Sequence, residues 1–257
     1  MTTVIITGAS MGIGRALALA WADEKATLIL SARGRDALDE VAEEVAARGA
    51  RAVVVAGDVT DEAHRVELVN RAALHGGVDI LINNAGRGFY SPALKIDVAK
   101  LRDLFELNVI APLRLVQLAA PQLEAAKGTV VMMSSVAGVV AAPRYGAYAA
   151  SKFALEAIAM ALRSELAEAS VRVVVIRPGP VDTPFRANAT RAEGESGYDA
   201  PDPKAQPADL VARKTVRAVL RGTPVVETSN FVRVASATSR FAPFVLRRAL
   251  RRMAAKR

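Results

Sequence analysis

Short apolar runs alternate with amphipathic stretches along most of the chain. Seven runs rich in β-branched residues predict strands: T-T-V-I-I (2–6), A-T-L-I-L-S (26–31), R-A-V-V-V-A (51–56), D-I-L-I-N (79–83), T-V-V-M-M-S (129–134), V-R-V-V-V-I (171–176) and P-V-V-E-T (224–228). Helical periodicity fills the stretches between them, notably 36–49, 97–126, 146–169 and 207–221. Strands that are apolar throughout and alternate with helices indicate a parallel sheet covered on both faces. We therefore predict a single α/β domain, a doubly wound Rossmann-type sheet of about seven strands.

One long segment breaks this alternation. Residues 184–206 are polar, rich in Gly and Pro, and lack periodicity. A loop of this length is usually functional or disordered, and this one follows the sixth strand at the sheet edge where ligands bind. We predict a mobile lid over the substrate, within a catalytic domain spanning 1–239 and followed by a tail at 240–257.

Composition excludes several kinds of chemistry. The chain of 257 residues is 52% hydrophobic, which is enough for a buried core, and it has no cysteine. Disulfides, thiolate catalysis and Cys-based metal sites are therefore excluded. Neither His64 nor His75 fits a metal cluster or a Ser-His-Asp triad, so no metal site is predicted. The sequence shows no basic apolar leader and no run of about 18 apolar residues, so we expect a cytoplasmic protein.

The positive charge is concentrated at the C-terminus. The formal net charge is +8, and residues 240–257 contain seven basic residues and no acid. The nearly neutral body argues against nucleic-acid binding. Pro243 suits a helix start, and the apolar residues Phe244, Leu246, Ala249, Leu250 and Met253 recur near helical spacing among arginines. Such a helix would either contact an anionic membrane surface or pack on the body or a second subunit.

The stretch T-G-A-S-M-G-I-G (7–14) joins the first strand to the first helix. Gly8, Gly12 and Gly14 have no Cβ, which permits a tight turn and close approach of backbone N–H groups to a diphosphate. The helix N-terminus adds a favourable dipole. In this strand–turn–helix context the pattern favours a dinucleotide site over a plain turn.

The end of the second strand bears on cofactor choice. An acid there would bond the ribose 2′-hydroxyl, but the chain has Ala32 followed by Arg33. Arginine suits a phosphate, so NADP(H) is favoured over NAD(H), although Arg33 could instead only solvate a helix start. Asp58 in G-D-V could contact adenine or cap the next helix.

The stretch Y-G-A-Y-A-A-S-K contains a second candidate site. Tyr148 and Lys152 are four residues apart, so they share one face of the predicted helix. A nearby cation lowers the pKa of a phenol from its usual value of ~10, which would tune an acid/base. The alternative is a surface lysine lying along an aromatic ring.

These motifs occur in a specific order. With N-N-A-G (83–86), Asn108, Ser135 and P-G-P-V-D-T (178–183), the chain resembles the short-chain dehydrogenase/reductase family from about Thr3 to Glu227. The Tyr-x-x-x-Lys spacing resembles the single-domain carbonyl/alcohol branch. In the family a serine lies thirteen residues before the catalytic tyrosine. This register implies Ser135 rather than Ser134, and Tyr148 rather than Tyr145, which is expected to line the pocket or pack.

The resemblance implies the role of each residue. Tyr148 would exchange the proton, Ser135 would bond the carbonyl oxygen, Lys152 would hold the nicotinamide ribose and lower the tyrosine pKa, and Asn108 would anchor a water. The cofactor would contact Gly8, Ser10, Gly12, Ile13, Gly14, Arg33, Asp58, Val59, Asn84, Ala85, Gly86, Tyr148, Lys152, Pro178, Gly179, Val181 and Thr183.

The function that we expect is an NADPH-dependent carbonyl reductase or alcohol dehydrogenase. The segments 87–94, 136–145 and 184–206 would wall the substrate, and the second is almost wholly apolar, which suggests a hydrophobic ketone or secondary alcohol. The alternatives are an NADP(H)-sensing regulator and an isomerase or dehydratase on the same scaffold. The resemblance also implies a homodimer or homotetramer formed through the helices that carry Asn108 and Tyr148.

Overall fold

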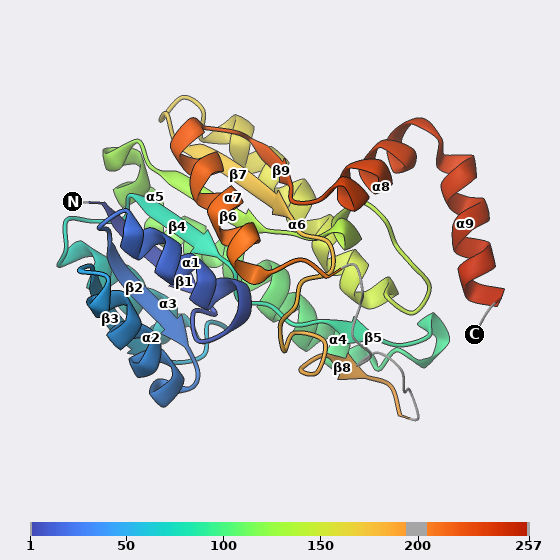
Figure 1. The fold of residues 1–257 in the computed structure, drawn as a ribbon, viewed down its shortest axis with the longest axis horizontal. Helices are drawn as coiled ribbons and strands as arrows, with labels where there is room; N and C mark the ends of the chain where they lie inside the picture. The colour runs from blue at the N-terminus through green and yellow to red at the C-terminus, as the bar shows by residue number, and fades with distance from the viewer. Residues whose placement is uncertain (1, 194–204, 256–257) are drawn as a thin grey trace.

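The computed structural model describes residues 2–193 and 205–255. Seven parallel strands form one sheet in the order β3-β2-β1-β4-β6-β7-β9, with helices on both faces (Figure 1). The strands are β1 (Thr3–Thr7), β2 (Thr27–Ala32), β3 (Arg51–Ala56), β4 (Ile80–Asn83), β6 (Thr129–Met133), β7 (Arg172–Arg177) and β9 (Val225–Glu227). The predicted doubly wound Rossmann-type domain is confirmed.

Two helical layers cover the sheet. One consists of α1 (Gly12–Asp23), α2 (Arg35–Ala47) and α7 (Ala208–Arg221), and the other consists of α3 (Glu62–Ala73), α5 (Ala111–Ala126) and α6 (Gly146–Glu165). Successive strand residues point to opposite faces. In β1, Val4 and Ile6 therefore pack in the first layer and Ile5 packs in the second. Because both faces are covered, the strands are apolar throughout, which is the pattern that predicted them.

The site lies at the carboxyl edge of the sheet. All seven strands run parallel, so the loops that follow them gather at one edge. The chain order reverses between β1 and β4, because β2 and β3 lie on one side of β1 and the later strands on the other. This reversal opens a crevice at the switch point, where ligands bind in such sheets.

The predicted helix over 97–126 is continuous but irregular. It consists of α4 (Val98–Phe105), a π-helical turn η2 (Glu106–Ile110) and α5. The irregularity precedes Pro112, because proline has no N–H to donate to the carbonyl of Asn108 four residues earlier.

The same helix, Val98–Ala126, is long and apolar enough to cross a membrane, although the sequence pattern predicted no such segment. Its Leu104, Leu115 and Leu123 are completely buried against the rest of the protein. We therefore assign it as a core helix.

A second, two-stranded sheet escaped prediction. β5 (Phe89–Tyr90) pairs in parallel with β8 (Thr190–Arg191), which ties the beginning of the predicted lid to the loop after β4. Residues 194–204 of that lid lie outside the described residues. Two 3₁₀ turns, η1 (Ala93–Lys95) and η3 (Val136–Gly138), complete the loops at this edge.

The chain ends in two helices, α8 (Asn230–Phe241) and α9 (Pro243–Ala255). The helix that begins at Pro243 was predicted, but α8 was not, and the predicted boundary between 239 and 240 falls inside it. The Ser229 hydroxyl caps α8 by accepting a hydrogen bond from the N–H of Val232 at 3.4 Å. In Figure 1 both helices lie at the end of the molecule remote from β2 and β3.

Candidate active site

The glycine loop (residues 7–14) leaves a space that a side chain at its glycine positions would fill. Gly8 and Gly12 have φ angles of +66° and +55°, a region that L-residues rarely adopt. A Cβ on Gly14 would lie 1.9 Å from the carbonyl oxygen of Gly8, and one on Gly12 would lie 3.0 Å from Cγ2 of Thr183. Ser10 and Ile13 are partly exposed in the same turn. The loop therefore fits a diphosphate that is held by backbone N–H groups at the start of α1.

The N-N-A-G segment locks this loop in place. The Asn84 amide donates to the carbonyls of Thr7 (2.9 Å) and Gly8 (3.2 Å). The Thr7 hydroxyl accepts from the N–H groups of Asn84 and Ala85, each at 3.0 Å. Asn83 points elsewhere, since its amide donates to the carbonyl of Pro112 at 3.4 Å, so it holds α5 rather than a ligand.

The loops after β2 and β3 form the outer side of the crevice. Arg33 is exposed, directly after Ala32 at the end of β2. The Asp58 carboxylate accepts hydrogen bonds from the N–H and hydroxyl of Thr60, at 2.9 and 2.8 Å. Burial raises the pKa of Asp58, but the bonds from Thr60 and the charges of Arg33 and His64 outweigh it, so the net pKa is lowered. Asp58 therefore presents a fixed negative charge beside the Arg33 guanidinium.

His64 is a residue of this region that sequence reasoning missed. Its ring is buried, and Nε2 lies 2.8 Å from the Ser31 hydroxyl at the end of β2. A Cβ on Gly57 would lie 2.3 Å from Nδ1 of His64, so the ring packs directly beneath the turn that leads to Asp58. Burial lowers the pKa of His64, against the opposing charge of Asp58, which favours the neutral ring. Only one weak signal for this role is present in the sequence, which is that His64 follows shortly after the G-D-V motif at 57–59.

The structure brings Ser135, Tyr148 and Lys152 together. Tyr148 and Lys152 are buried on one face of α6, and the Tyr148 hydroxyl is hydrogen-bonded to Ser135. The Lys152 ammonium lies 5.9 Å from the centre of the Tyr148 ring. Ser134, one residue out of register, has a buried hydroxyl with no hydrogen-bond partner among the described residues. Tyr145 packs edge-on against Tyr90, with ring centres 5.4 Å apart.

The protonation of this pair differs from the expectation. Burial raises the pKa of Tyr148 to about 12, opposed by the hydrogen bond to Ser135, so the expected lowering by Lys152 does not occur here. Burial lowers the pKa of Lys152 to about 8, opposed by the charge of Glu156. The Lys152 ammonium donates to the Met133 carbonyl at 2.8 Å. Burial outweighs the hydrogen bond to Ser135, and Tyr148 is therefore a neutral phenol at pH 7.

Asn108 lies close to Lys152, and Gly86 contacts both side chains. It is completely buried in the π-helical turn, where its side chain pairs with the backbone of Arg87 through two bonds of 3.0 Å and donates to the Ser151 hydroxyl at 3.0 Å. A Cβ on Gly86 would lie 3.1 Å from Oδ1 of Asn108 and 3.7 Å from Nζ of Lys152. The absence of that Cβ lets the N-N-A-G loop lie against both side chains.

The segment after β7 closes the remaining side. The Pro178 carbonyl accepts from the N–H of Val136 at 2.8 Å, which joins this segment to the loop that carries Ser135. Val181 pairs with Gln206, so the far end of the predicted lid returns to the same place. Gly179 lies against Val232 of α8, and Thr183 lies against the glycine loop.

The predicted site residues thus gather at the carboxyl edge of the sheet, and their arrangement suits one kind of chemistry. The glycine loop, N-N-A-G and the segment after β7 fit a dinucleotide along the switch point, and a bound nicotinamide would supply or accept hydride. Ser135 and the Tyr148 phenol offer two hydroxyls at one point, which suits a carbonyl oxygen that gains negative charge. This is a site for interconverting a carbonyl and an alcohol.

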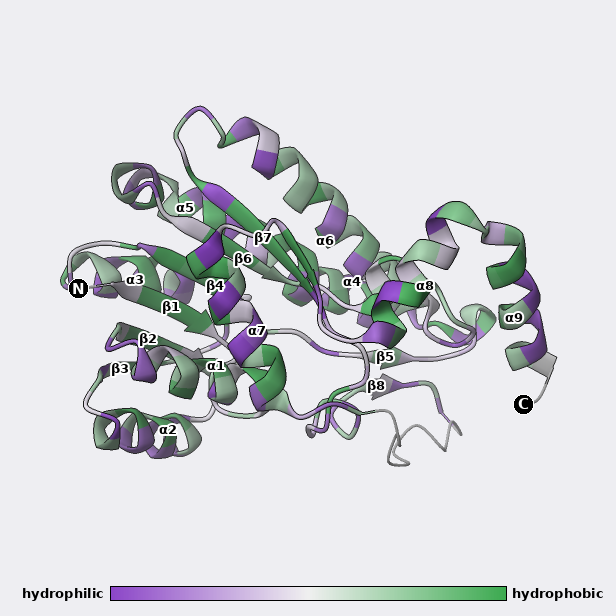
Figure 2. Cartoon of the chain, turned by 45° about the horizontal axis from the view of Figure 1, so that its top comes forward, coloured by the Kyte–Doolittle hydropathy of each residue, from purple (hydrophilic) through white to green (hydrophobic). Residues whose placement is uncertain are grey.

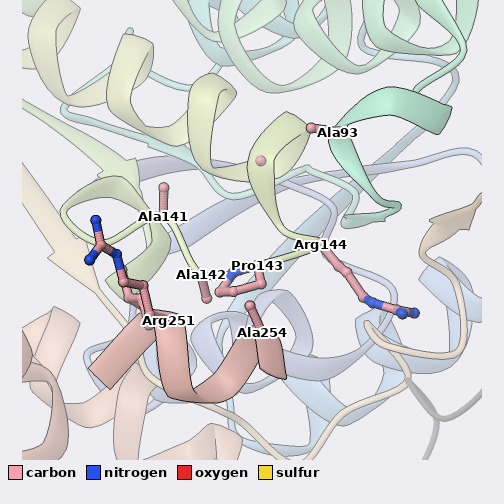
Figure 3. A pocket seen from close by; sticks show the side chains of 9 residues that line it. Ala93, Ala141, Ala142, Pro143, Arg144, Arg251 and Ala254 are labelled. Atoms are coloured by element: carbon pink, nitrogen blue, oxygen red, sulfur yellow. The ribbon is translucent and has the colours of Figure 1, made fainter. Parts of the chain in front are cut away.

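Two surface hollows lie outside the crevice. One, of about 360 Å³, separates α9 from the loop at 141–146, and its lining is mostly alanine, proline and leucine. Figure 3 shows Ala142 and Pro143 of the loop opposite Ala254 of α9. The other, of about 510 Å³, lies beside Phe89, with Lys95, Asp97, Lys100 and Glu193 around it. Neither is lined by Ser135, Tyr148 or Lys152. The candidate active site is therefore assigned from the positions of these three side chains and not from a surface hollow.

Comparison with known proteins gives the class. The model of the short chain dehydrogenase family matches residues 2–194, and the chain belongs to this family. It is an oxidoreductase of the family that acts on the CH–OH/C=O group.

Two similar relatives match over most of their length. The ketoacyl reductase HetN of Nostoc is 30% identical over 231 residues, 88% of this chain and 80% of the relative. Dehydrogenase/reductase SDR family member 7B of Danio rerio is 35% identical over 228 residues, 84% of this chain and 73% of the relative. Glycine betaine reductase ATRR of Emericella nidulans is 37% identical, but the match spans only 16% of its length.

Solved structures agree on the fold and differ in cofactor. A short-chain dehydrogenase from Sphingobium yanoikuyae in complex with NADPH has a TM-score of 0.82 at 26% identity, covering 97% of this chain and 95% of that one. One from Burkholderia phymatum in complex with NAD also has a TM-score of 0.82 at 26% identity, covering 93% and 92%. Similar proteins thus bind either nucleotide.

Proposed function

We propose that the protein is an NADPH-dependent reductase of hydrophobic ketones, with Tyr148 as the proton donor. One observation carries the proposal: a buried, neutral Tyr148 phenol bonded to Ser135 at the switch point of the sheet. A phenol whose pKa is about 12 is protonated at pH 7 and donates to an oxygen that becomes an alkoxide. The reverse reaction, alcohol oxidation, would use the same residues.

The preference for NADPH rests on the loop after β2. Arg33 offers an exposed guanidinium where an acid would otherwise hold the ribose 2′-hydroxyl. Asp58 is held by Thr60 rather than by Arg33, so the guanidinium keeps its donors for a phosphate. Charge-assisted hydrogen bonds to a phosphate are worth about 1.5–3 kcal/mol each.

We expect Arg33→Ala to raise the KM for NADPH by about 10- to 100-fold and to leave the KM for NADH nearly unchanged. Steady-state kinetics with each cofactor would measure both values. Arg35→Ala is the matched control, because Arg35 is also exposed but pairs with Asp39 on the same helix. If Arg33→Ala raises the KM for NADPH and for NADH equally, Arg33 does not bind the 2′-phosphate.

The walls of the crevice support an apolar substrate. Tyr148 lies in a cluster with Phe89, Leu104 and Ala137, and the Phe185 ring packs at 5.7 Å from the Tyr148 ring. The loop at 139–143 adds valine, alanine and proline. Such walls favour bulky aliphatic or polycyclic carbonyls over small polar ones.

The test is NADPH consumption against a panel of ketones that runs from short polar to long-chain and polycyclic compounds. Tyr148→Phe is the blank. We expect turnover that increases with the apolar size of the ketone and is absent in the blank. Tight NADPH binding without turnover of any ketone or oxidation of any matching alcohol would contradict the proposal and favour a nucleotide-sensing protein.

We also propose that the chain assembles as a homodimer or homotetramer through the helices that bear Asn108 and Tyr148. Phe153 and Met160 lie two turns apart on α6 and are 45% and 67% exposed, and Ile110 is 47% exposed on the neighbouring helix. Apolar side chains on adjoining helices suit a symmetric helix-to-helix interface.

A further inference from the structure

The C-terminal segment of the sequence carries the whole net charge of the chain. Residues 228–257 contain eight basic residues and no acid, whereas the chain has a formal net charge of +8. The first 227 residues are therefore neutral overall. Six of these basic residues are described arginines, at 233, 240, 247, 248, 251 and 252, and within the described part of the chain none forms an ion pair.

Large apolar side chains are exposed among these arginines. Val234 and Phe241 lie two turns apart on α8 and are 65% and 77% exposed. Phe244 and Val245 follow in the first turn of α9, at 68% and 47% exposed. Figure 2 shows green and purple residues alternating along both helices. Phenylalanine at this exposure leaves a large apolar surface in contact with water.

Contacts with the body fix the direction in which α8 presents this surface. Val232 is completely buried, and the Ser239 hydroxyl donates to the carbonyl of Val139 at 2.8 Å. Ser239 holds the opposite side of α8 on the loop that follows Ser135, and Val232 holds it against Gly179 in the segment after β7. The side of α8 that carries Val234 and Phe241 therefore faces away from the body.

We propose that the outer face of α8 and α9, made of Val234, Phe241, Phe244, Val245 and the described arginines other than Arg251, is a docking surface for bilayers that contain anionic lipids. Phenyl rings partition into the region between head groups and acyl chains, while arginines bind lipid phosphates beside them. This combination of exposed rings and unpaired arginines complements an anionic lipid surface in both polarity and charge.

Charge disfavours the other occupants of this face. Two copies meeting through it would bring the arginines of α8 and α9 from each copy together, and residues 228–257 contain no acid that could pair with them. A nucleic acid would match the arginines, but it would leave the contiguous valines and phenylalanines of α8 and α9 uncovered.

The docking surface adjoins the proposed active site. α8 rests on the loop after Ser135, and α9 lies across the hollow from Ala141, Ala142 and Pro143 (Figure 3). A lipid-soluble ketone would then enter directly from the bilayer. This consequence rests on the proposed function, whereas lipid binding itself does not.

Co-sedimentation of the intact protein with vesicles tests the proposal. We expect binding to vesicles of phosphatidylcholine mixed with phosphatidylglycerol, weak binding to phosphatidylcholine alone, and release by added salt. Phe241→Ser with Phe244→Ser should lower the partition coefficient by roughly tenfold per ring. Arg247→Gln with Arg248→Gln should lower it by about fivefold per arginine, and only on the anionic vesicles.

Matched substitutions elsewhere control for a general loss of apolar surface or charge. Leu74→Ser removes a side chain that is 74% exposed at the end of α3, and Arg51→Gln removes an exposed arginine at the start of β3. Neither should change vesicle binding. NADPH turnover of a water-soluble ketone should be the same in all four variants and the wild type, so lipid binding is scored independently of catalysis.

Two results would overturn the proposal. One is an equal fraction of protein sedimenting with neutral and with anionic vesicles. The same conclusion would follow if the wild type and both double variants sedimented equally. The other is a vesicle-independent oligomer, seen by light scattering, that dissociates in Phe241→Ser with Phe244→Ser, since the face would then be a subunit interface.

Discussion

Replacing Tyr148 with phenylalanine should leave NADPH binding intact and lower the turnover number by about 10²- to 10⁴-fold, the range typical of a general acid. The ring is buried beside Phe185, and phenylalanine preserves this packing. The substitution removes only the hydroxyl that bonds Ser135 and donates the proton. Fluorescence titration with NADPH and initial rates of ketone reduction would separate binding from catalysis.

Tyr145→Phe is the matched control for this prediction. It removes a phenol hydroxyl three residues away, on a ring that packs edge-on against Tyr90. We expect its turnover number to remain within about tenfold of the wild type, because the hydroxyl that bonds Ser135 belongs to Tyr148. Near-normal turnover in Tyr148→Phe, or an equal loss in both variants, would contradict the assignment of the proton donor.

Replacing Gly14 with alanine should abolish NADPH binding and lower the free energy of unfolding by about 3 kcal/mol or more. In an ordinary helix this change is favourable by about 1 kcal/mol, because alanine forms helices better than glycine. Here the added Cβ would lie 1.9 Å from the Gly8 carbonyl oxygen and 2.7 Å from the Asn84 amide nitrogen. Neither neighbour has room to move, since Asn84 holds the loop by two hydrogen bonds, so the clash outweighs the helix preference.

Thermal unfolding and NADPH titration would measure both effects of Gly14→Ala. Gly34→Ala is the matched control, because a Cβ there meets no heavy atom within 4 Å. Its effect on the free energy of unfolding should be about 1 kcal/mol or less, because alanine is a poorer N-cap than glycine but meets no clash here. Unchanged NADPH binding in Gly14→Ala would show that the glycine loop is not the diphosphate cradle.

Several features followed from local sequence alone. The apolar β-branched runs located the seven strands, because a sheet covered on both faces leaves few polar positions within a strand. The glycine spacing located the turn after β1, and the i, i+4 spacing set Tyr148 and Lys152 on one helix face. These inferences needed only the periodicity of the backbone and the covalent structure of each residue.

The pairing of remote segments needed the tertiary structure. The strand β5 has only two residues and exists because Thr190 and Arg191 lie beside it, about a hundred residues later in the chain. The bond between Ser31 and His64 likewise forms only when α3 packs beneath the end of β2. The position of α8, a helix that was not predicted, is fixed through Val232 and Ser239 by contacts with the body.

The sequence by itself determined the sheet, and it predicted the nucleotide-binding loop and the acid/base pair. Only the tertiary structure decided how that pair is protonated, because Lys152 is close enough in sequence to lower the Tyr148 pKa, yet burial of the phenol raises it to about 12. It also decided that the phenylalanines of α8 and α9 face outward rather than into the core. Both outcomes depend on which atoms exclude water from a side chain, and those atoms come from segments far apart in the sequence.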